Sequence, residues 1–284
     1  MKALAFRLLH QSGCVRLFRF LYQRRRVTIL LFHDPSPTAM EMALRYLTRF
    51  YRIISLQTYL EARSAGTTDR LPEYSLILTF DDGHRGNYAL LPLFEKYGVP
   101  ATIFLCSAIV DTYRHFWFLD ADGVLPVERL KALPNTERLE CLGGIQFAEE
   151  KEYPTRQALS AREIQRMRPL IDFQSHTRFH SILTTCARAR VRASLQGAKE
   201  RLERDFGLSI NALAYPNGDY DTRTVEETRT AGYRCGLTVD HGFNDDDTDL
   251  FLLRRLDVND TEDVHELAVK ASGLWQHLKS MHLP

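Results

Sequence analysis

The alternation of apolar runs with helical patterns is the feature of this sequence that most restricts its fold. Eight runs rich in β-branched and aromatic residues have the length and composition of strands. They cover residues 27–32, 51–55, 75–80, 101–105, 170–173, 212–215, 235–239 and 252–258. Helical patterns separate most of them, at residues 40–50, 87–97, 161–167, 191–206, 222–231 and 261–278. Strands that are apolar on both faces and alternate with helices indicate a parallel sheet covered on both sides.

The number of these units favours a closed barrel over an open sheet. Seven or eight strand–helix units fit into residues 27–284, which matches the size of a (β/α) barrel. We therefore expect an α/β fold with a single barrel domain over residues 27–284. Residues 111–160 contain Trp117, three glycines and three prolines without a strong period. We interpret them as an insertion over one end of the barrel.

The composition excludes several classes of protein. Hydrophobic residues make up 44% and charged residues 26% of the 284 residues, which is typical of a globular chain. The 37 Lys and Arg residues and 36 Asp and Glu residues are too evenly balanced for a general nucleic-acid binder. The 5 cysteines are widely spaced without a CxxC pair, so a reducing compartment fits best. The absence of GxSxG, Walker and GxGxxG motifs argues against serine hydrolase, P-loop and Rossmann functions.

Residues 1–26 differ from the rest of the chain. They carry seven Lys and Arg residues and no acid, and their apolar residues fall on one face of a predicted helix. We expect a basic amphipathic helix that either packs on the domain or makes peripheral contact with an anionic membrane. Arg7 interrupts the apolar stretch early and no small-residue cleavage site follows, unlike a secretory signal peptide. We therefore expect a cytoplasmic protein.

Asp81 and Asp82 directly follow the predicted strand at residues 75–80. Carboxylates at the carboxyl end of a barrel strand face the mouth where active sites lie. Two adjacent anions repel each other, and a bound metal ion would hold at least one of them ionised. A simple Asp-Asp-Gly turn, with Asp82 capping the next helix, is the structural alternative.

His176 and His180 follow the predicted strand at residues 170–173. Two imidazoles four residues apart can bind one metal ion if the segment coils into a turn. Together with a carboxylate from another strand end, they would form a three-ligand site with open positions for water. Two unrelated surface histidines are the alternative.

Two further segments follow predicted strands. The loop that begins at Tyr215 could place a backbone N–H at the site as an oxyanion donor. His33 follows the first predicted strand and is a candidate proton donor. An ordinary Pro/Gly turn and a structural histidine are the corresponding alternatives.

These segments occur together in a recognisable order. Residues 79–83 read TFDDG, residues 175–184 read SHTRFHSILT, and residues 215–218 read YPNG. The combination resembles the polysaccharide deacetylase family, which is carbohydrate esterase family 4, over about residues 27–260. The resemblance implies a distorted (β/α) barrel, a bound divalent metal ion, usually zinc, and removal of N-acetyl groups from amino sugars.

The resemblance also implies roles for individual residues. Asp81 would be the general base, Asp82, His176 and His180 would bind the metal, and the loop at Tyr215 would supply an oxyanion-hole N–H. Residues 213–216 lack the arginine of the family's third motif, and we expect Arg255, or alternatively Arg254, to replace it. The family's C-terminal leucine–histidine pair is also absent. The Phe32-His33 pair resembles permuted poly-N-acetylglucosamine deacetylases, whose general acid lies there.

The sequence therefore predicts a metal-dependent hydrolase that removes N-acetyl groups from amino sugars of a polysaccharide or glycoconjugate precursor. An N-acetylated glycan or glycolipid is the expected substrate, and nucleic acid is not an expected partner. Two alternatives remain open: a catalytically decayed carbohydrate-binding barrel, and a related enzyme that removes an O-acetyl or formyl group.

Overall fold

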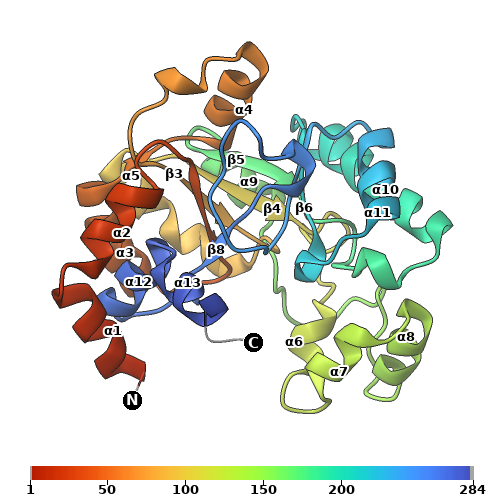
Figure 1. The fold of residues 1–284 in the computed structure, drawn as a ribbon. Coiled ribbons are helices and arrows are strands. Elements are labelled where there is room, and N and C mark those ends of the chain that lie inside the picture. The colour runs from red at the N-terminus through yellow and green to blue at the C-terminus, as the bar shows by residue number, and fades with distance from the viewer. Residues whose placement is uncertain (1, 282–284) are drawn as a thin grey trace.

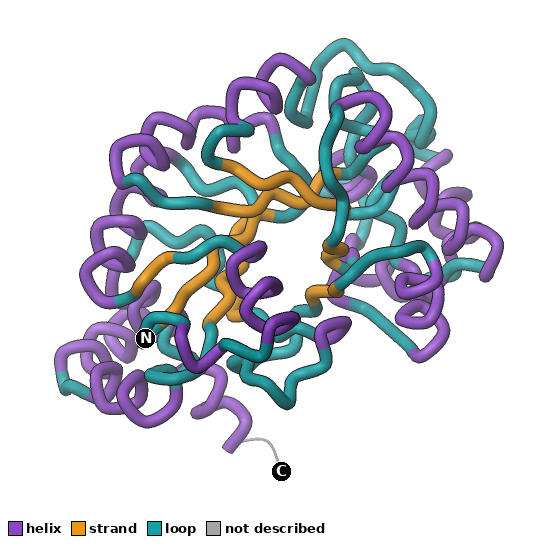
Figure 2. Tube along the Cα trace, turned by 90° about the horizontal axis from the view of Figure 1, so that it is seen from above, coloured by secondary structure: helices purple, strands orange, loops and turns teal. Residues whose placement is uncertain are grey.

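A single curled sheet of eight parallel strands forms the centre of the molecule. The computed structural model describes residues 2–281, so Met1 and residues 282–284 of the expected domain lie outside it. The strands are β1 (Thr28–Phe32), β2 (Arg52–Ile53), β3 (Ser75–Phe80), β4 (Ala101–Leu105), β5 (Ile171–Ser175), β6 (Ala212–Ala214), β7 (Cys235–Leu237) and β8 (Leu256–Asp257). Their order in the sheet is β7-β6-β5-β4-β3-β1-β8, and β2 pairs with the first half of β3. Figure 2 shows the sheet curling into a barrel with helices around its outside.

The two ends of the sheet are joined by irregular backbone rather than by full strands. The N–H of Leu253 donates to the carbonyl of Gly236, and the N–H of Thr238 donates back to Leu253, both at 2.9 Å. The predicted strand at residues 252–258 is shortened to β8, and a 3₁₀ turn, η5 (Leu250–Leu252), occupies its start. The expected distorted (β/α) barrel is confirmed, and its distortion lies at this junction.

Helices cover the outer face of the barrel and its amino-terminal end. The main helices are α3 (Pro37–Phe50), α4 (Leu56–Ala65), α5 (Leu91–Tyr97), α9 (Ala161–Met167), α10 (Arg188–Phe206), α11 (Thr222–Thr230), α12 (Val264–Ala271) and α13 (Leu274–Met281). Four further 3₁₀ turns are η1 (Thr68–Arg70), η2 (Arg85–Leu90), η3 (Leu183–Thr185) and η4 (Pro216–Gly218). Every residue of β1 and β3 is buried because one strand face packs inside the barrel and the other under helices.

Residues from α4 and from the barrel strands share one apolar cluster. Ile29 and Ile77 lie in this cluster beside Leu56, Tyr59 and Leu60 of α4. The helix therefore closes the amino-terminal end of the barrel, at the top of Figure 1. The opposite, carboxyl-terminal end remains available for a site, as in other parallel barrels.

The insertion at residues 111–160 folds into three short helices. These are α6 (Trp117–Ala121), α7 (Val127–Ala132) and α8 (Asn135–Gly143). They form a small apolar cluster of their own, and its Trp117 side chain donates a hydrogen bond to the carbonyl of His180 at 3.1 Å. Figure 1 shows these helices at the end of the barrel opposite α4. The insertion therefore borders the carboxyl-terminal mouth.

The N-terminal segment forms two helices, so the prediction of a single helix over residues 1–26 is wrong. They are α1 (Lys2–Gln11) and α2 (Cys14–Tyr22), and Gly13 between them has φ of 83°, a left-handed conformation that glycine adopts without steric cost. Phe6, Val15 and Phe18 are buried in a cluster with residues of α12 and α13. The segment packs on the domain. Within residues 2–281, no helix has both the length and the apolar character that a membrane crossing requires.

Candidate active site

Asp82 reaches the mouth of the barrel through a sharp turn after β3. Asp82 and Gly83 both have left-handed backbone, with φ of 73° and 76°. A Cβ atom on Gly83 would lie 2.6 Å from the Cδ2 of Leu105, so this close approach requires glycine. The turn brings the carboxylate of Asp82 into a buried position at the carboxyl end of the strand.

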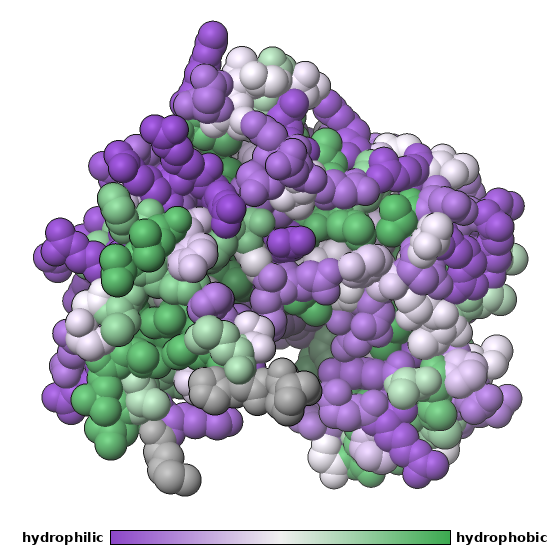
Figure 3. Space-filling view, viewed as in Figure 1, coloured by the Kyte–Doolittle hydropathy of each residue, from purple (hydrophilic) through white to green (hydrophobic). Residues whose placement is uncertain are grey.

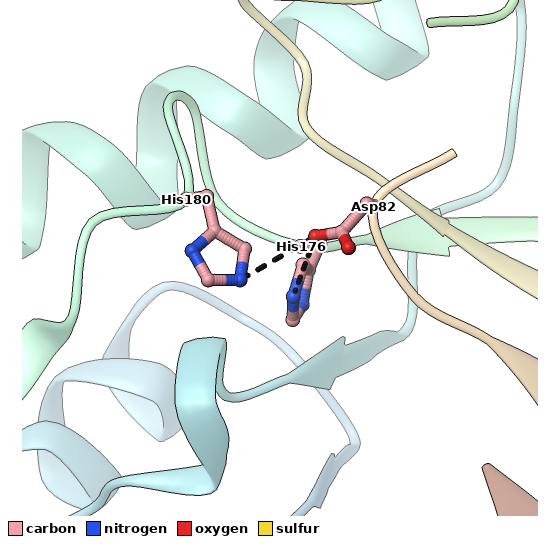
Figure 4. Close-up of side chains that lie close together, drawn as sticks. All are labelled: Asp82, His176 and His180. Atoms are coloured by element: carbon pink, nitrogen blue, oxygen red, sulfur yellow. Dashed lines mark ion pairs between the residues drawn. The ribbon is translucent and has the colours of Figure 1, made fainter. Parts of the chain in front are cut away.

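Asp82, His176 and His180 form a compact group, shown in Figure 4. The Oδ1 atom of Asp82 lies 3.5 Å from Nε2 of His176 and 3.4 Å from Nε2 of His180. All three side chains are buried, and their ligand atoms lie within 4.8 Å of one another. The structure thus brings the three expected metal ligands together from the ends of β3 and β5.

The chemistry of this group fits a divalent metal ion. Ligand atoms bound tetrahedrally to zinc at about 2.1 Å lie about 3.4 Å apart, close to the spacing observed here. The Oδ1 atom of Asp82 is buried without a hydrogen-bond partner, so it is available as a ligand. Nδ1 of His176 lies 2.8 Å from the carbonyl of Ala214, which requires the proton on Nδ1 and leaves the lone pair of Nε2 facing Asp82. Burial lowers the pKa of His180 to about 3, and the Asp82 carboxylate only partly opposes this effect. Both imidazoles are therefore suited to bind a metal through a lone pair.

His84 is a member of the site that the sequence analysis missed. Its Nε2 atom lies 3.1 Å from Oδ2 of Asp82, the carboxylate oxygen that does not face the other histidines. Burial opposes charge on both groups, but their contact lowers the pKa of Asp82 and raises the pKa of His84. His84 thus holds the carboxylate so that Oδ1 faces the metal position. The signal in the sequence that could have identified His84 is its position two residues after Asp82.

Asp81 is held by Arg255, which comes from the loop before β8. Nη1 of Arg255 donates to Oδ1 of Asp81 at 2.7 Å, and Nη2 donates to Oδ2 at 2.8 Å. Burial tends to raise the pKa of Asp81, but the Arg255 guanidinium, together with the neighbouring His176 and His33, outweighs burial and holds that pKa below its usual range. Arg254, the alternative, instead lies against Gly242. The structure therefore places Arg255, and not Arg254, on the expected base.

Tyr215 does not offer its backbone N–H to the site, which corrects the expectation for this residue. That N–H donates to the carbonyl of Leu237 at 3.0 Å, because the pairing between β6 and β7 continues one residue past Ala214. The Tyr215 ring is buried beside Gly236. Asn217 lines the cleft instead, and its N–H has no acceptor among residues 2–281. The free N–H of the loop is therefore that of Asn217.

Several residues of the site have strained backbone. Thr177, His180 and Asn217 have φ of 68°, 56° and 60°, in addition to Asp82. Residues other than glycine rarely adopt this left-handed region, and such strain clusters at functional sites. The two ligand loops and the Asn217 loop are thus held in conformations that the surrounding fold imposes.

His33 and His241 both line the same cleft. The cleft has a volume of about 550 Å³ and extends from the ligand group toward Phe118 and Leu119 of the insertion. His33 is exposed, and its backbone N–H donates to the carboxylate of Asp260 at 3.1 Å. The cleft therefore offers two histidines as proton donors.

The fold and this cleft define a parallel (β/α) barrel whose polar site lies at the carboxyl ends of its strands. The sequence profile described as polysaccharide deacetylase matches residues 68–236, more than half of the chain. The protein belongs to the polysaccharide deacetylase family.

Individual relatives support the same family. YxkH of Bacillus subtilis, named as a polysaccharide deacetylase, is 23% identical over 70% of this chain and 57% of its own length. The poly-beta-1,6-N-acetyl-D-glucosamine N-deacetylase of Escherichia coli is 22% identical over 68% of this chain and 29% of its own length. The chain thus spans a little more than half of the length of YxkH and less than a third of the length of the Escherichia coli relative. The structure of the Streptococcus pyogenes deacetylase PplD in complex with acetate has the same fold, with a TM-score of 0.65 and 18% identity over 87% of this chain and 98% of that chain.

Proposed function

We propose that this protein is a metal-dependent hydrolase that removes N-acetyl groups from amino sugars of a polysaccharide or glycoconjugate. The observation that carries the proposal is the placement of the Asp82, His176 and His180 group beside the Asp81–Arg255 pair in one cleft. The name of the Escherichia coli relative supports N-acetyl chemistry.

Asp82, His176 and His180 would hold one divalent ion. Two imidazoles and one carboxylate form a donor set that suits zinc and leaves coordination positions open. When bound, such an ion supplies a Lewis acid for the acetamide oxygen and lowers the pKa of water.

Asp81 is positioned to accept a proton from the attacking water. The bidentate contact with Arg255 keeps its carboxylate ionised and fixes its orientation toward the cleft. A carboxylate that is ionised at neutral pH and lines the cleft is suited to act as a general base.

The remaining steps use the Asn217 loop and a histidine. Asn217 lines the cleft and its N–H has no acceptor among residues 2–281, so this N–H is the candidate donor to the oxyanion that forms during attack. His33 would then protonate the nitrogen of the departing amine, since an amide anion is too poor a leaving group. Acetate and a free amino sugar result.

The alternative of a decayed, carbohydrate-binding barrel loses its main support. That alternative rested on the missing arginine of the family's third motif. Arg255 contacts Asp81 from the loop before β8 and can take the part of that arginine. The base and the three candidate metal ligands are all present in the cleft.

An acetate-release assay tests the proposal. Metal-loaded protein would be incubated with N-acetylated chitooligosaccharides and with poly-β-1,6-N-acetylglucosamine, and acetate would be measured. We expect release by the parent protein and a loss of about 10²- to 10⁴-fold in Asp81→Asn, which should retain its fold and metal. Release from O-acetylated glycans alone would instead support the O-deacetylase alternative, and release from no glycan would contradict the proposal.

A further inference from the structure

The two N-terminal helices are apolar on both of their faces. Phe6, Val15 and Phe18 point inward and are buried against the domain. Five large apolar side chains point away from it, with exposed fractions of 62% for Leu4, 60% for Leu8, 59% for Leu17, 52% for Phe20 and 61% for Leu21. We call these five residues the outer apolar face. A surface helix normally has polar residues on its outer side, so this face indicates a second apolar partner.

The outer apolar face is continuous along the helices. Leu4 and Leu8 are one turn apart on α1, and Leu17 and Leu21 are one turn apart on α2, so each pair lies side by side. In Figure 3 the apolar surface on the left lies over the position of α1 and α2 in Figure 1. The exposed leucines and the phenylalanine thus gather on one side of the molecule.

Unpaired cations border this face. Arg7 of α1 and Arg16 of α2 are exposed, and neither has an ion-pair partner among residues 2–281. Residues 2–26 contain no carboxylate side chain. Arg7 and Arg16 directly precede Leu8 and Leu17, so charge and apolar surface are interleaved. This combination matches the interface of a bilayer with anionic headgroups.

We propose that α1 and α2 dock on the surface of an anionic lipid bilayer, with the outer apolar face in the headgroup region. A second copy of the chain fits the same face poorly, because a twofold contact would bring two groups of cations together without a carboxylate between them. Neither helix is long enough to cross a bilayer, so both lie in its plane.

Docking through α1 places the active-site cleft near the lipid. Lys2 and Phe6 line a small depression together with His241 and Asp257. The same two residues, His241 and Asp257, also line the cleft that holds the candidate metal ligands. If the proposed deacetylase function holds, the substrate class is an amino sugar attached to a membrane lipid.

A vesicle experiment tests the docking. Full-length protein would be sedimented with vesicles of phosphatidylglycerol and phosphatidylcholine, and with vesicles of phosphatidylcholine alone. We expect binding to the anionic vesicles that weakens as salt is raised. Leu17→Glu/Phe20→Glu should weaken this binding at least about tenfold, since both side chains leave the lipid. Arg7→Gln/Arg16→Gln should reduce the preference for anionic over neutral vesicles.

A matched control keeps the result specific. Tyr113 and Val124 are exposed apolar side chains of the insertion, with 54% and 64% of their surface accessible. Tyr113→Glu/Val124→Glu adds the same charge away from α1 and α2 and should bind anionic vesicles like the parent. Failure of the parent to bind either vesicle would overturn the proposal, as would equal binding by Leu17→Glu/Phe20→Glu. Dimerisation that this variant abolishes, without vesicle binding by the parent, would assign the face to self-association instead.

The substrate class has a separate measurement. Deacetylation of N-acetylglucosamine carried on a lipid in anionic vesicles would be compared with deacetylation of a soluble N-acetylated oligosaccharide. We expect Leu17→Glu/Phe20→Glu to lose turnover on the vesicle substrate and to retain the parent's turnover on the soluble one. Equal turnover by both proteins on both substrates would overturn the inference but leave the proposed function intact. No turnover of either substrate by the parent would contradict the proposed function, and the sedimentation result would still decide the docking.

Discussion

Arg255 and Asp81 form a buried bidentate ion pair, with nitrogen–oxygen distances of 2.7 and 2.8 Å. The Nε atom of Arg255 also donates to the carbonyl of Thr238 at 2.8 Å, so the guanidinium is fixed on both sides. Arg255 is therefore a positioning residue for the proposed base: it orients the carboxylate and keeps it ionised without touching the substrate.

Replacing Arg255 with lysine tests this positioning role. Arg255→Lys keeps the charge but cannot form two parallel hydrogen bonds, so we expect kcat to fall by about 10- to 100-fold. The pKa of Asp81 should rise toward its usual value, and the acid limb of the kcat/KM profile should move to higher pH. A pH profile of the parent and the variant checks this. Loss of thermal stability with an unchanged pH profile would show that the contact is only structural.

The metal ligands can be tested by direct analysis. The purified protein should hold about one divalent ion per chain, and both His176→Ala and His180→Ala should lose it, because each removes one of three ligands. Elemental analysis by mass spectrometry measures the content. His115→Ala is a suitable control, since His115 contacts Asp120 in the insertion and does not belong to the ligand group. Unchanged metal content in both ligand variants would show that the site is wrongly assigned.

The barrel and the group of three candidate metal ligands could both be predicted from the sequence. Long apolar runs predict strands regardless of their exact ends, and the spacing between Asp82, His176 and His180 follows from two local motifs. Which arginine reaches Asp81 was harder to predict, because adjacent residues of an extended chain point to opposite sides. Only the direction of each side chain in the folded barrel shows that Arg255 contacts Asp81 and that Arg254 does not.

Which backbone N–H is free in the loop that begins at Tyr215 depends on the residue at which β6 stops pairing with β7. The sheet pairing of β6 continues to Tyr215, and that single additional hydrogen bond occupies the expected donor. Strand boundaries are the least predictable part of a sequence interpretation. The break between α1 and α2 at Gly13 has a similar origin, since an isolated glycine within a helical pattern does not always end the helix.

Asn217 allows the proposed oxyanion donor to be tested without changing a catalytic side chain. Asn217→Gly keeps the N–H and fits φ of 60°, so turnover should stay close to that of the parent. Asn217→Val places a β-branched residue in left-handed backbone, and displacing the N–H should reduce turnover by about 10²- to 10³-fold. Acetate release by both variants, with circular dichroism as a folding control, measures the difference. Equal losses in the two variants would assign the role to the Asn217 side chain.

Glu163 gives a prediction for stability as a function of pH. Its side chain forms a capping box with Ser160 at the start of α9, and it accepts hydrogen bonds from Arg156 at 2.6 and 3.0 Å. Burial alone would raise its pKa, but the Arg156 and Ser160 contacts lower it to about 2 from the usual 4.5. The ionised form therefore stabilises the fold above pH 4.5, and this stabilisation is lost as the pH falls from 4.5 to about 2.

The matching experiment compares two glutamate variants by chemical denaturation. Because Glu163 is partly solvated, Glu163→Gln should reduce the free energy of unfolding at neutral pH by only about 1 to 2 kcal/mol. The difference from the parent should shrink as the pH approaches 2. Glu128→Gln removes an exposed ion pair with Lys131 and should change the stability by less than about 0.5 kcal/mol. A deficit for Glu163→Gln that stays constant from neutral to acidic pH would refute this account.

His33 and His241 are the two candidates for the general acid, and substrates with different leaving groups can distinguish between them. Both line the cleft, but His33 directly follows β1, whose neighbours in the sheet are β3, which precedes Asp81, and β8. An amide nitrogen must be protonated before it leaves, whereas an activated ester needs little help. His33→Ala should therefore reduce acetamide hydrolysis by about 10²- to 10⁴-fold while ester hydrolysis changes far less. His241→Ala serves as the control and should affect both substrates similarly. Equal losses on both substrates for His33→Ala would remove His33 from the reaction, and a larger amide-specific loss for His241→Ala would transfer the role to His241.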